Sequence, residues 1–171
     1  MSRVLIAYHS QTGNTRKAAH TLAQRLHADI EPIAPLGPLG PFAYLGRVMR
    51  AVAKAQVAPP KPQHDPARYD LVVIAGPIRA GHLSPEVNGY IARHAEFIER
   101  HAMLLTCGGA RTDRALAQAR RAMGRDPVAT CAITDEHRAS GTAVREIESL
   151  AATVEQGLAR GDSPPVAADA P

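Results

Sequence analysis

The sequence predicts an α/β fold, in which a doubly wound, five-stranded parallel sheet lies between two layers of helices. Short apolar segments alternate with longer amphipathic segments along the whole chain. This alternation predicts parallel strands joined by right-handed crossover helices. The segment 69–75 is apolar after Asp70, as expected of a strand buried on both faces. Such units suit the strand order 2-1-3-4-5, in which ligands bind beyond the carboxyl ends of the strands.

The first part of the chain is predicted to hold two strand–helix units. A strand is expected over residues 3–8, and a helix over residues 14–27, where alanines and leucines recur on one face. A short strand follows over residues 29–33, and the repeated Leu-Gly-Pro of residues 36–41 then breaks the chain. A basic amphipathic helix is predicted over residues 42–55. We interpret it as a crossover packed on the sheet, with a membrane-surface or partner helix as the alternative.

A third and a fourth unit follow a proline-rich loop. A strand over residues 69–75 leads into a loop over residues 76–83. Ser84 and Pro85 then carry N-cap and first-turn signals for a helix that ends near His94. The next strand is expected over residues 102–107.

The last units end the predicted domain. Thr112 is the expected cap of a helix that stops at Gly124. A strand is expected over residues 128–134, and a final helix carries Val144, Ile147, Ala151, Val154 and Leu158. The tail, residues 161–171, is rich in Pro, Ala and Asp and is expected to be disordered. Residues 1–160 are therefore predicted to form one domain.

Composition indicates a globular cytoplasmic protein. The chain has 171 residues, of which 45% are apolar, enough for one domain with a real core. No apolar run approaches the roughly 18 residues of a membrane span, and no signal peptide is apparent. Cys107 and Cys131 fall in predicted buried strands without metal-binding spacing, which suits a reducing compartment. A disulfide between them would require that neighbouring strands align them.

The positive charge does not by itself predict a nucleic-acid partner. The net charge is +4, but the arginines are spread over several predicted helix faces, and aromatic residues make up only 4% of the chain. A stacking platform for single strands is therefore not expected. We therefore interpret the charge as a solvated basic surface. Such a surface would steer an acidic partner or an anionic ligand by electrostatics.

The most informative segment joins the first strand to the first helix. Ser10, Thr12, Asn14 and Thr15 place neutral side-chain donors beside backbone N–H groups that have no helical partner. Such a helix start attracts an anion. The segment lacks the lysine of a Walker loop and has only one glycine of a dinucleotide fingerprint. The alternative interpretation is an ordinary capped strand–turn–helix.

The segment Ser-Gln-Thr-Gly-Asn-Thr, residues 10–15, resembles the phosphate loop of the flavodoxin family. The resemblance extends in order over residues 3–26, 69–92 and 102–120. Residues 70–85 are similar to a form of the second flavin loop in small bacterial flavodoxin-like proteins, and Leu-Thr-Cys-Gly-Gly-Ala is similar to the third loop. The resemblance implies a flavodoxin-like fold that binds FMN.

By this resemblance, three loops hold the cofactor. The first loop would hold the phosphate through Ser10, Gln11, Thr12, Gly13, Asn14 and Thr15. The second would cover one side of the isoalloxazine with Pro77, Ile78, Arg79, Ala80, Gly81 and His82. The third would contact the pyrimidine edge with Thr106, Cys107, Gly108, Gly109 and Ala110.

The chain departs from the family where an aromatic ring usually stacks on the flavin. The matching positions are Ile78, Arg79 and Ala110, and the chain has no tryptophan. One lost stack costs on the order of 0.5–1.5 kcal/mol, so weaker FMN binding is expected. Arg79 is either a planar replacement for the ring, whose charge would raise the flavin potential, or a solvent-facing arginine.

Other residues of the predicted crevice leave two interpretations each. His9 and His82 are either proton donors to a flavin or quinone, or polar loop residues, and two histidines could also catch a metal by chance. Cys107 is either close to the flavin or simply a small buried residue. No metal site is predicted, and no catalytic residue is assigned.

Three functions fit these patterns. The first is an FMN-binding electron-transfer protein with a protein redox partner. The second is an FMN-dependent NAD(P)H:quinone-type oxidoreductase, and the third is a non-redox binding module with a decayed flavin site. The basic helix predicted at residues 42–55 would be a candidate homodimer face.

Overall fold

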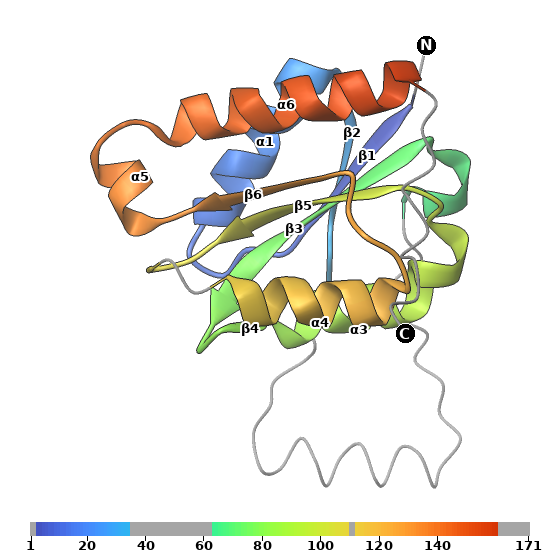
Figure 1. The fold of residues 1–171 in the computed structure, drawn as a ribbon, viewed down its shortest axis with the longest axis horizontal. Helices are drawn as coiled ribbons and strands as arrows, with labels where there is room; N and C mark the ends of the chain where they lie inside the picture. Colours follow the sequence, from blue (N-terminus) through green and yellow to red (C-terminus); the bar gives the residue numbers. More distant parts are fainter. Residues whose placement is uncertain (1–2, 35–62, 110–111, 161–171) are drawn as a thin grey trace, which may run out of the picture.

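A parallel sheet forms the centre of the molecule. The computed structural model describes residues 3–34, 63–109 and 112–160 (Figure 1). The parallel strands are β1 (Val4–Tyr8), β2 (Asp29–Pro32), β3 (Leu71–Arg79), β5 (His101–Thr106) and β6 (Ala129–Ile133). They lie in the order β2-β1-β3-β5-β6. This is the predicted order 2-1-3-4-5, so the predicted fold class is confirmed.

Helices cover both faces of the sheet, giving three layers (Figure 1). The helices α1 (Asn14–Leu26) and α6 (Ala143–Arg160) pack on one face. The helices α3 (Pro85–His94) and α4 (Asp113–Met123) pack on the other. Single turns of 3₁₀-helix lie at Pro66–Arg68 and Ala95–Phe97. No helix of the described residues is long and apolar enough to cross a membrane.

Successive side chains of each strand point to opposite faces of the sheet, so the core is divided between the two faces. Ile6, Val73 and Leu104 pack against α1 and α6. Their neighbours in the strands, such as Leu5 and Met103, pack against α3 and α4. Each such side chain stabilises the fold by roughly 1.5–3 kcal/mol when fully buried. The middle of the sheet is therefore closely packed on both faces, and polar loops are left to its ends.

The parallel register brings several strand ends to one edge. Tyr8 pairs with Ala75, Pro77 with Thr106, and Thr106 with Ile133. The loops after β1, β3, β5 and β6 therefore emerge at the same edge, as the topology predicts.

The prediction of a loop over residues 76–83 is wrong, because this segment is mostly strand. β3 continues to Arg79 and turns back through β4 (His82–Leu83), which pairs antiparallel to it. The two central residues of the turn, Ala80 and Gly81, have φ values of 48° and 80°. These left-handed conformations are those of a type I′ hairpin turn, which matches the twist of the flanking strands.

A short helix, α5 (Asp135–Ala139), was not predicted between β6 and α6. At the start of α6, Val144 is 53% exposed and not part of the core stripe predicted for the final helix. Thr112 occupies the predicted N-cap position of α4, but its side chain accepts no capping hydrogen bond. Gly124 ends α4 with a φ of 67°, as predicted.

Three predicted features lie outside the described residues. They are the Leu-Gly-Pro segment 36–41, the helix over residues 42–55 and the tail 161–171.

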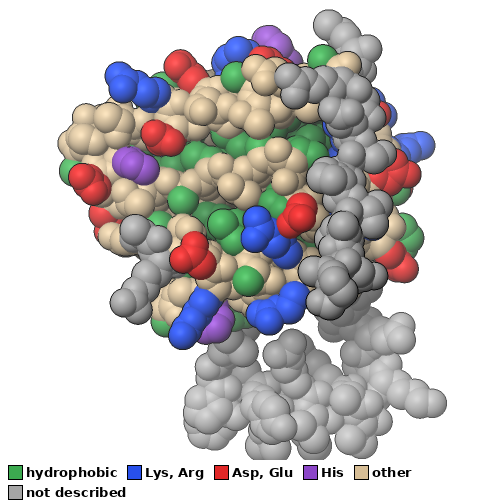
Figure 2. Space-filling model, viewed as in Figure 1, with side chains coloured by type: hydrophobic (Ala, Val, Ile, Leu, Met, Phe, Trp, Pro, Cys, Tyr) green, Lys and Arg blue, Asp and Glu red, His purple; other side chains and the backbone are tan. Residues whose placement is uncertain are grey.

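The cysteines, Cys107 and Cys131, are both buried free thiols. On the face presented in Figure 2, positive and negative side chains are interspersed.

Candidate functional site

The loop after β1 leaves the start of α1 open. The Ser10 hydroxyl accepts a hydrogen bond from the Gly13 N–H at 3.1 Å, which closes the loop on itself. Gly13 is the N-cap residue and has a φ of 91°, a conformation that glycine adopts without a Cβ penalty. Among the described residues, no side chain caps α1, and its first turn holds no acidic residue. The positive end of the helix is therefore available to an anion.

Two buried threonines join the first loop to the third. The Thr15 and Thr106 hydroxyl oxygens lie 2.7 Å apart, and these residues are only 2% and 5% exposed. Thr15 is in the first turn of α1, and Thr106 is the last residue of β5. The hydrogen bond fixes the helix start against the end of a central strand.

A second contact joins the first loop to the hairpin. Arg79, at the end of β3, donates a hydrogen bond to the side-chain carbonyl of Gln11. The three segments singled out in the sequence therefore meet at one place, as the predicted topology requires.

A cleft of about 170 Å³ lies between these segments. It is lined by ten of the residues predicted for the site, together with Arg138: Gln11, Thr12, Asn14, Thr15, Pro77, Ile78, Arg79, Thr106, Cys107 and Gly108. Among the described residues that line it, two are arginines and none is Asp or Glu. The lining therefore has two cationic side chains, of which Arg138 is paired with Asp135 behind the wall, beside neutral hydroxyl and amide donors.

The remaining predicted residues lie around this cleft. Ser10 lines a neighbouring, larger cleft. Gly13, Ala80, Gly81, His82 and Gly109 line neither of the two clefts, although each belongs to one of the three loops. His82 is exposed at the hairpin. Ala110 lies outside the described residues.

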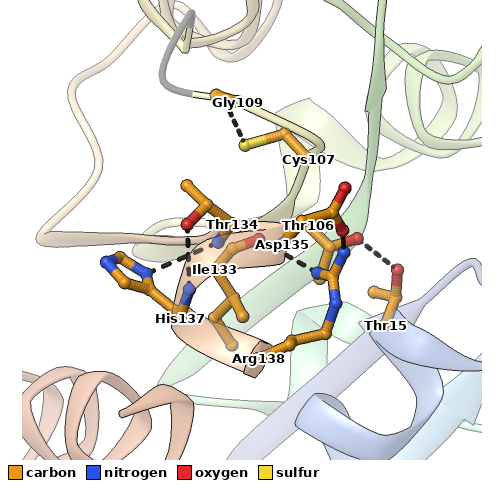
Figure 3. Close-up of polar contacts among 9 residues, drawn as sticks. All are labelled: Thr15, Thr106, Cys107, Gly109, Ile133, Thr134, Asp135, His137 and Arg138. Carbon is orange, nitrogen blue, oxygen red and sulfur yellow. Dashed lines mark hydrogen bonds and ion pairs between the residues drawn. The ribbon is translucent and has the colours of Figure 1, made fainter. Parts of the chain in front are cut away.

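Arg138 is the lining residue that the sequence analysis missed. It lies on α5, and its guanidinium points toward Thr106 and Asp135 (Figure 3). It donates to the Ile133 carbonyl at 3.4 Å and pairs with the Asp135 carboxylate. A polar Thr-Asp-Glu-His-Arg segment directly after the last strand was the only signal in the sequence.

The third loop is held by its own cysteine. The Cys107 thiol donates to the Gly109 carbonyl at 2.7 Å (Figure 3). Cys107 is buried and lines the cleft. It is therefore a small buried residue, as one of the two interpretations expected, and its position in the cleft wall leaves the flavin contact a prediction.

The neighbouring cleft has a volume of about 670 Å³. Its wall includes Tyr8, Ile33 and Arg16, and it shares Gln11 and Arg79 with the small cleft. The contact between these two shared side chains therefore lies on the boundary of both clefts.

A histidine and a carboxylate face each other in this larger cleft. The His9 Nε2 lies 3.5 Å from the Glu86 carboxylate, which is in the first turn of α3. Tyr8 is the one aromatic residue of the described chain that lines either cleft. Across the described residues, no three His, Cys, Asp or Glu side chains are grouped to hold a metal ion.

Comparison with known protein families agrees with this arrangement. A family model described as a flavodoxin domain matches residues 43–133, more than half of the chain. The chain belongs to the flavodoxin domain family. The matched residues include the hairpin and the third loop of this flavodoxin-like protein, and the first loop precedes them. No curated protein sequence matches it.

Solved flavodoxin-like structures have the same fold. A flavoprotein from Lactobacillus acidophilus, in complex with FMN, is 16% identical with a TM-score of 0.58, covering 82% of this chain and 98% of its own. A WrbA-like flavodoxin from Agrobacterium tumefaciens is 12% identical with a TM-score of 0.59, covering 91% and 99%. A flavodoxin from Streptococcus pneumonia is 13% identical with a TM-score of 0.55, covering 91% and 99%. At these identities, the likeness concerns the fold.

Proposed function

We propose that this flavodoxin-like protein binds FMN at the small cleft and transfers electrons to a redox partner protein. The single observation that carries the proposal is the junction of the open α1 start with a cleft that has two arginines and, among its described lining, no carboxylate. A phosphate monoester matches that combination of backbone donors, hydroxyls and positive charge. The FMN complex of the Lactobacillus acidophilus structure supports the same ligand.

The phosphate and the chain next to it fit the small cleft. Asn14 and Thr15 line it at the start of α1, where backbone N–H groups have no helical partner. At about 170 Å³, the cleft is smaller than those that enclose a whole drug-sized ligand. The flavin ring therefore lies at the mouth, between the hairpin and the third loop.

Pro77 and Ile78 supply the apolar surface of the hairpin wall for the ring. No aromatic side chain of the described residues lines the small cleft. We therefore still expect FMN to bind roughly tenfold more weakly than it would to a site with one aromatic ring stacked on the flavin. When bound, FMN supplies one-electron and two-electron chemistry, and the protein supplies orientation and electrostatics. Arg79 adds a positive charge at the ring end, which raises the flavin potential.

A second candidate function is an FMN-dependent NAD(P)H:quinone-type oxidoreductase. The larger cleft favours it, because about 670 Å³ is enough for a small-molecule donor or acceptor beside the first cleft. A ligand there would meet the His9 imidazole, whose Nε2 lies 3.5 Å from the Glu86 carboxylate. Steady-state turnover with NAD(P)H and a quinone, lowered in His9→Gln, would select this function. Absence of turnover, with reduction only through a reductase protein, would select the electron-transfer protein.

The proposal treats residues 1–160 as one domain in the cytoplasm. The free thiols Cys107 and Cys131 suit a reducing compartment.

Titration of the purified protein with FMN tests the proposal, with flavin fluorescence as the readout. We expect one-to-one quenching that is weakened in Thr12→Ala and Asn14→Ala. Thr21→Ala is the matched control, because Thr21 lies on the same helix and donates to the Lys17 carbonyl away from the cleft. No binding up to about 100 μM FMN, a free energy weaker than roughly 5.5 kcal/mol, would leave only the non-redox binding module.

A further inference from the structure

We propose that Arg138 is a specificity-determining residue that supplies the positive charge for the phosphate, so that the site selects FMN over riboflavin. The inference rests on the proposed function and deepens it. The donors of the first loop, such as Thr12 and Asn14, are all neutral. Arg138 comes from another segment, shares the cleft with these residues and can give the phosphate a charged partner.

The position of Arg138 is fixed by the cap of α5. The Thr134 hydroxyl accepts from the His137 N–H at 3.2 Å, and the His137 Nδ1 accepts from the Thr134 N–H at 3.4 Å. These reciprocal hydrogen bonds form a capping box at the end of β6 (Figure 3). Arg138, the next residue, is thus held beside the last residues of the parallel strands.

The helix α5 abuts the third loop. A Cβ atom at Gly108 would lie 3.3 Å from the Asp135 carboxylate oxygen. The same carboxylate pairs with the Arg138 guanidinium, and the Arg138 side chain is 27% exposed. Most of this side chain is therefore covered, which holds the charge at the cleft wall rather than in bulk water.

The guanidinium retains donors for a ligand. It has five N–H donors, and its described contacts are with the Ile133 carbonyl and the Asp135 carboxylate. The planar fork can bind two oxygens of a phosphate with the remaining donors. A phosphate that enters the cleft would share the guanidinium with the Asp135 carboxylate, which occupies one side of the fork.

Arg79 is the other arginine of the cleft, and it differs from Arg138 in exposure and in partner. It lies on the exposed hairpin, where its guanidinium contacts Gln11. Arg138 is less exposed, and a partly covered charge interacts more strongly with an anion than an exposed one does. We therefore assign the phosphate to Arg138 rather than to Arg79.

Parallel titrations of FMN and riboflavin test this inference. In Arg138→Gln, we expect the Kd for FMN to rise about tenfold or more at low salt, from the loss of a charge-assisted hydrogen bond. The Kd for riboflavin should change by less than about twofold, since riboflavin lacks the phosphate. Arg138→Lys should show an intermediate FMN affinity, because it keeps the charge and loses the fork.

A matched control and a flavin-free probe complete the design. Arg121→Gln makes the same charge change on the exposed face of α4, at the end of that helix away from the site, and should bind both flavins as the unmodified protein does. Inorganic phosphate should raise the Tm of the unmodified protein and not that of Arg138→Gln. Circular dichroism and the Tm without ligand establish that each variant is folded.

The outcomes are distinct. If Arg138→Gln loses affinity for FMN and riboflavin equally, Arg138 only shapes the cleft. If it loses no affinity for FMN, Arg138 does not contact the phosphate. Either result overturns the inference. If neither flavin binds the unmodified protein, the proposed function fails. The Arg138-dependent effect of inorganic phosphate then still decides whether Arg138 forms an anion site.

Discussion

Thr15 and Thr106, which are 91 positions apart in the sequence, share a buried hydrogen bond 2.7 Å long. This bond joins the start of the first helix to the end of a central strand, beside the cleft. The geometry of the candidate phosphate site therefore depends on a tertiary contact as well as on the local loop.

The first prediction concerns this pair. Thr15→Val or Thr106→Val leaves one buried hydroxyl without its partner and should lower the free energy of unfolding by about 1–3 kcal/mol. The double variant removes both hydroxyls and should lose less than the sum of the single losses. Urea denaturation of the four proteins measures the coupling. Additive losses would show that the two hydroxyls do not stabilise each other.

The second prediction concerns the close approach of β3 to α3. A Cβ atom at Gly76 would lie 2.3 Å from the Val87 Cγ2, so Gly76→Ala should lower the free energy of unfolding by about 1–3 kcal/mol. Val87→Ala removes the clashing methyl groups and should offset part of the loss in the double variant. Gly89→Ala is the control, because its Cβ would meet no atom within 4 Å. It should stabilise α3 by up to about 1 kcal/mol. A stable Gly76→Ala would contradict the tight packing.

The third prediction concerns the hairpin turn. Ala80 has a φ of 48°, a conformation that is costly for a residue other than glycine or asparagine. Ala80→Asn creates the Asn-Gly pair that type I′ turns favour, so the Tm should rise by the equivalent of about 0.5–1 kcal/mol. Ala80→Val should lower the Tm, because a β-branched residue fits the left-handed region badly. If both variants had the same Tm, the turn would not be type I′.

The fourth prediction concerns pH. Burial, with a smaller effect of Arg125, lowers the pKa of the His101 imidazole to about 4 from 6.5. Between these values the unfolded chain binds a proton that the folded protein does not, so stability rises with pH in this range. The contribution of His101 is complete above about pH 6.5, and acidification to pH 4 removes at most about 3 kcal/mol.

His101→Leu tests the pH effect. His101 is fully buried, and neither ring nitrogen has a hydrogen-bond partner among the described residues. The variant should therefore show a flatter loss of stability on acidification. His20→Gln, at an exposed position of α1, should keep the slope of the unmodified protein. An unchanged slope in His101→Leu would show that other groups cause the acid sensitivity.

The sequence predicted those parts of the candidate cleft that depend on local pattern and strand order. The apolar alternation placed the loops after β1, β3 and β5 at one edge, and the structure brings Gln11, Arg79 and Thr106 to one cleft. The hairpin was missed because Ala-Gly is a weak turn signal compared with Asn-Gly. Arg138 was missed because its position depends on an ion pair with Asp135 and on the fold of α5, which no periodicity indicates.

The hairpin has a further consequence for how the site moves. It is the direct continuation of a central strand, with Ile78 opposite Leu83 and the Ser84 N–H donating to the Pro77 carbonyl at 3.3 Å. Its paired amides are therefore hydrogen-bonded as in a strand, and their hydrogen exchange should be slower than that of an open loop. A wall that is stiff in this way changes little in shape when a ligand gains or loses charge beside it. If the protein transfers electrons through FMN, as we propose, the reorganisation energy that limits the rate would then be small.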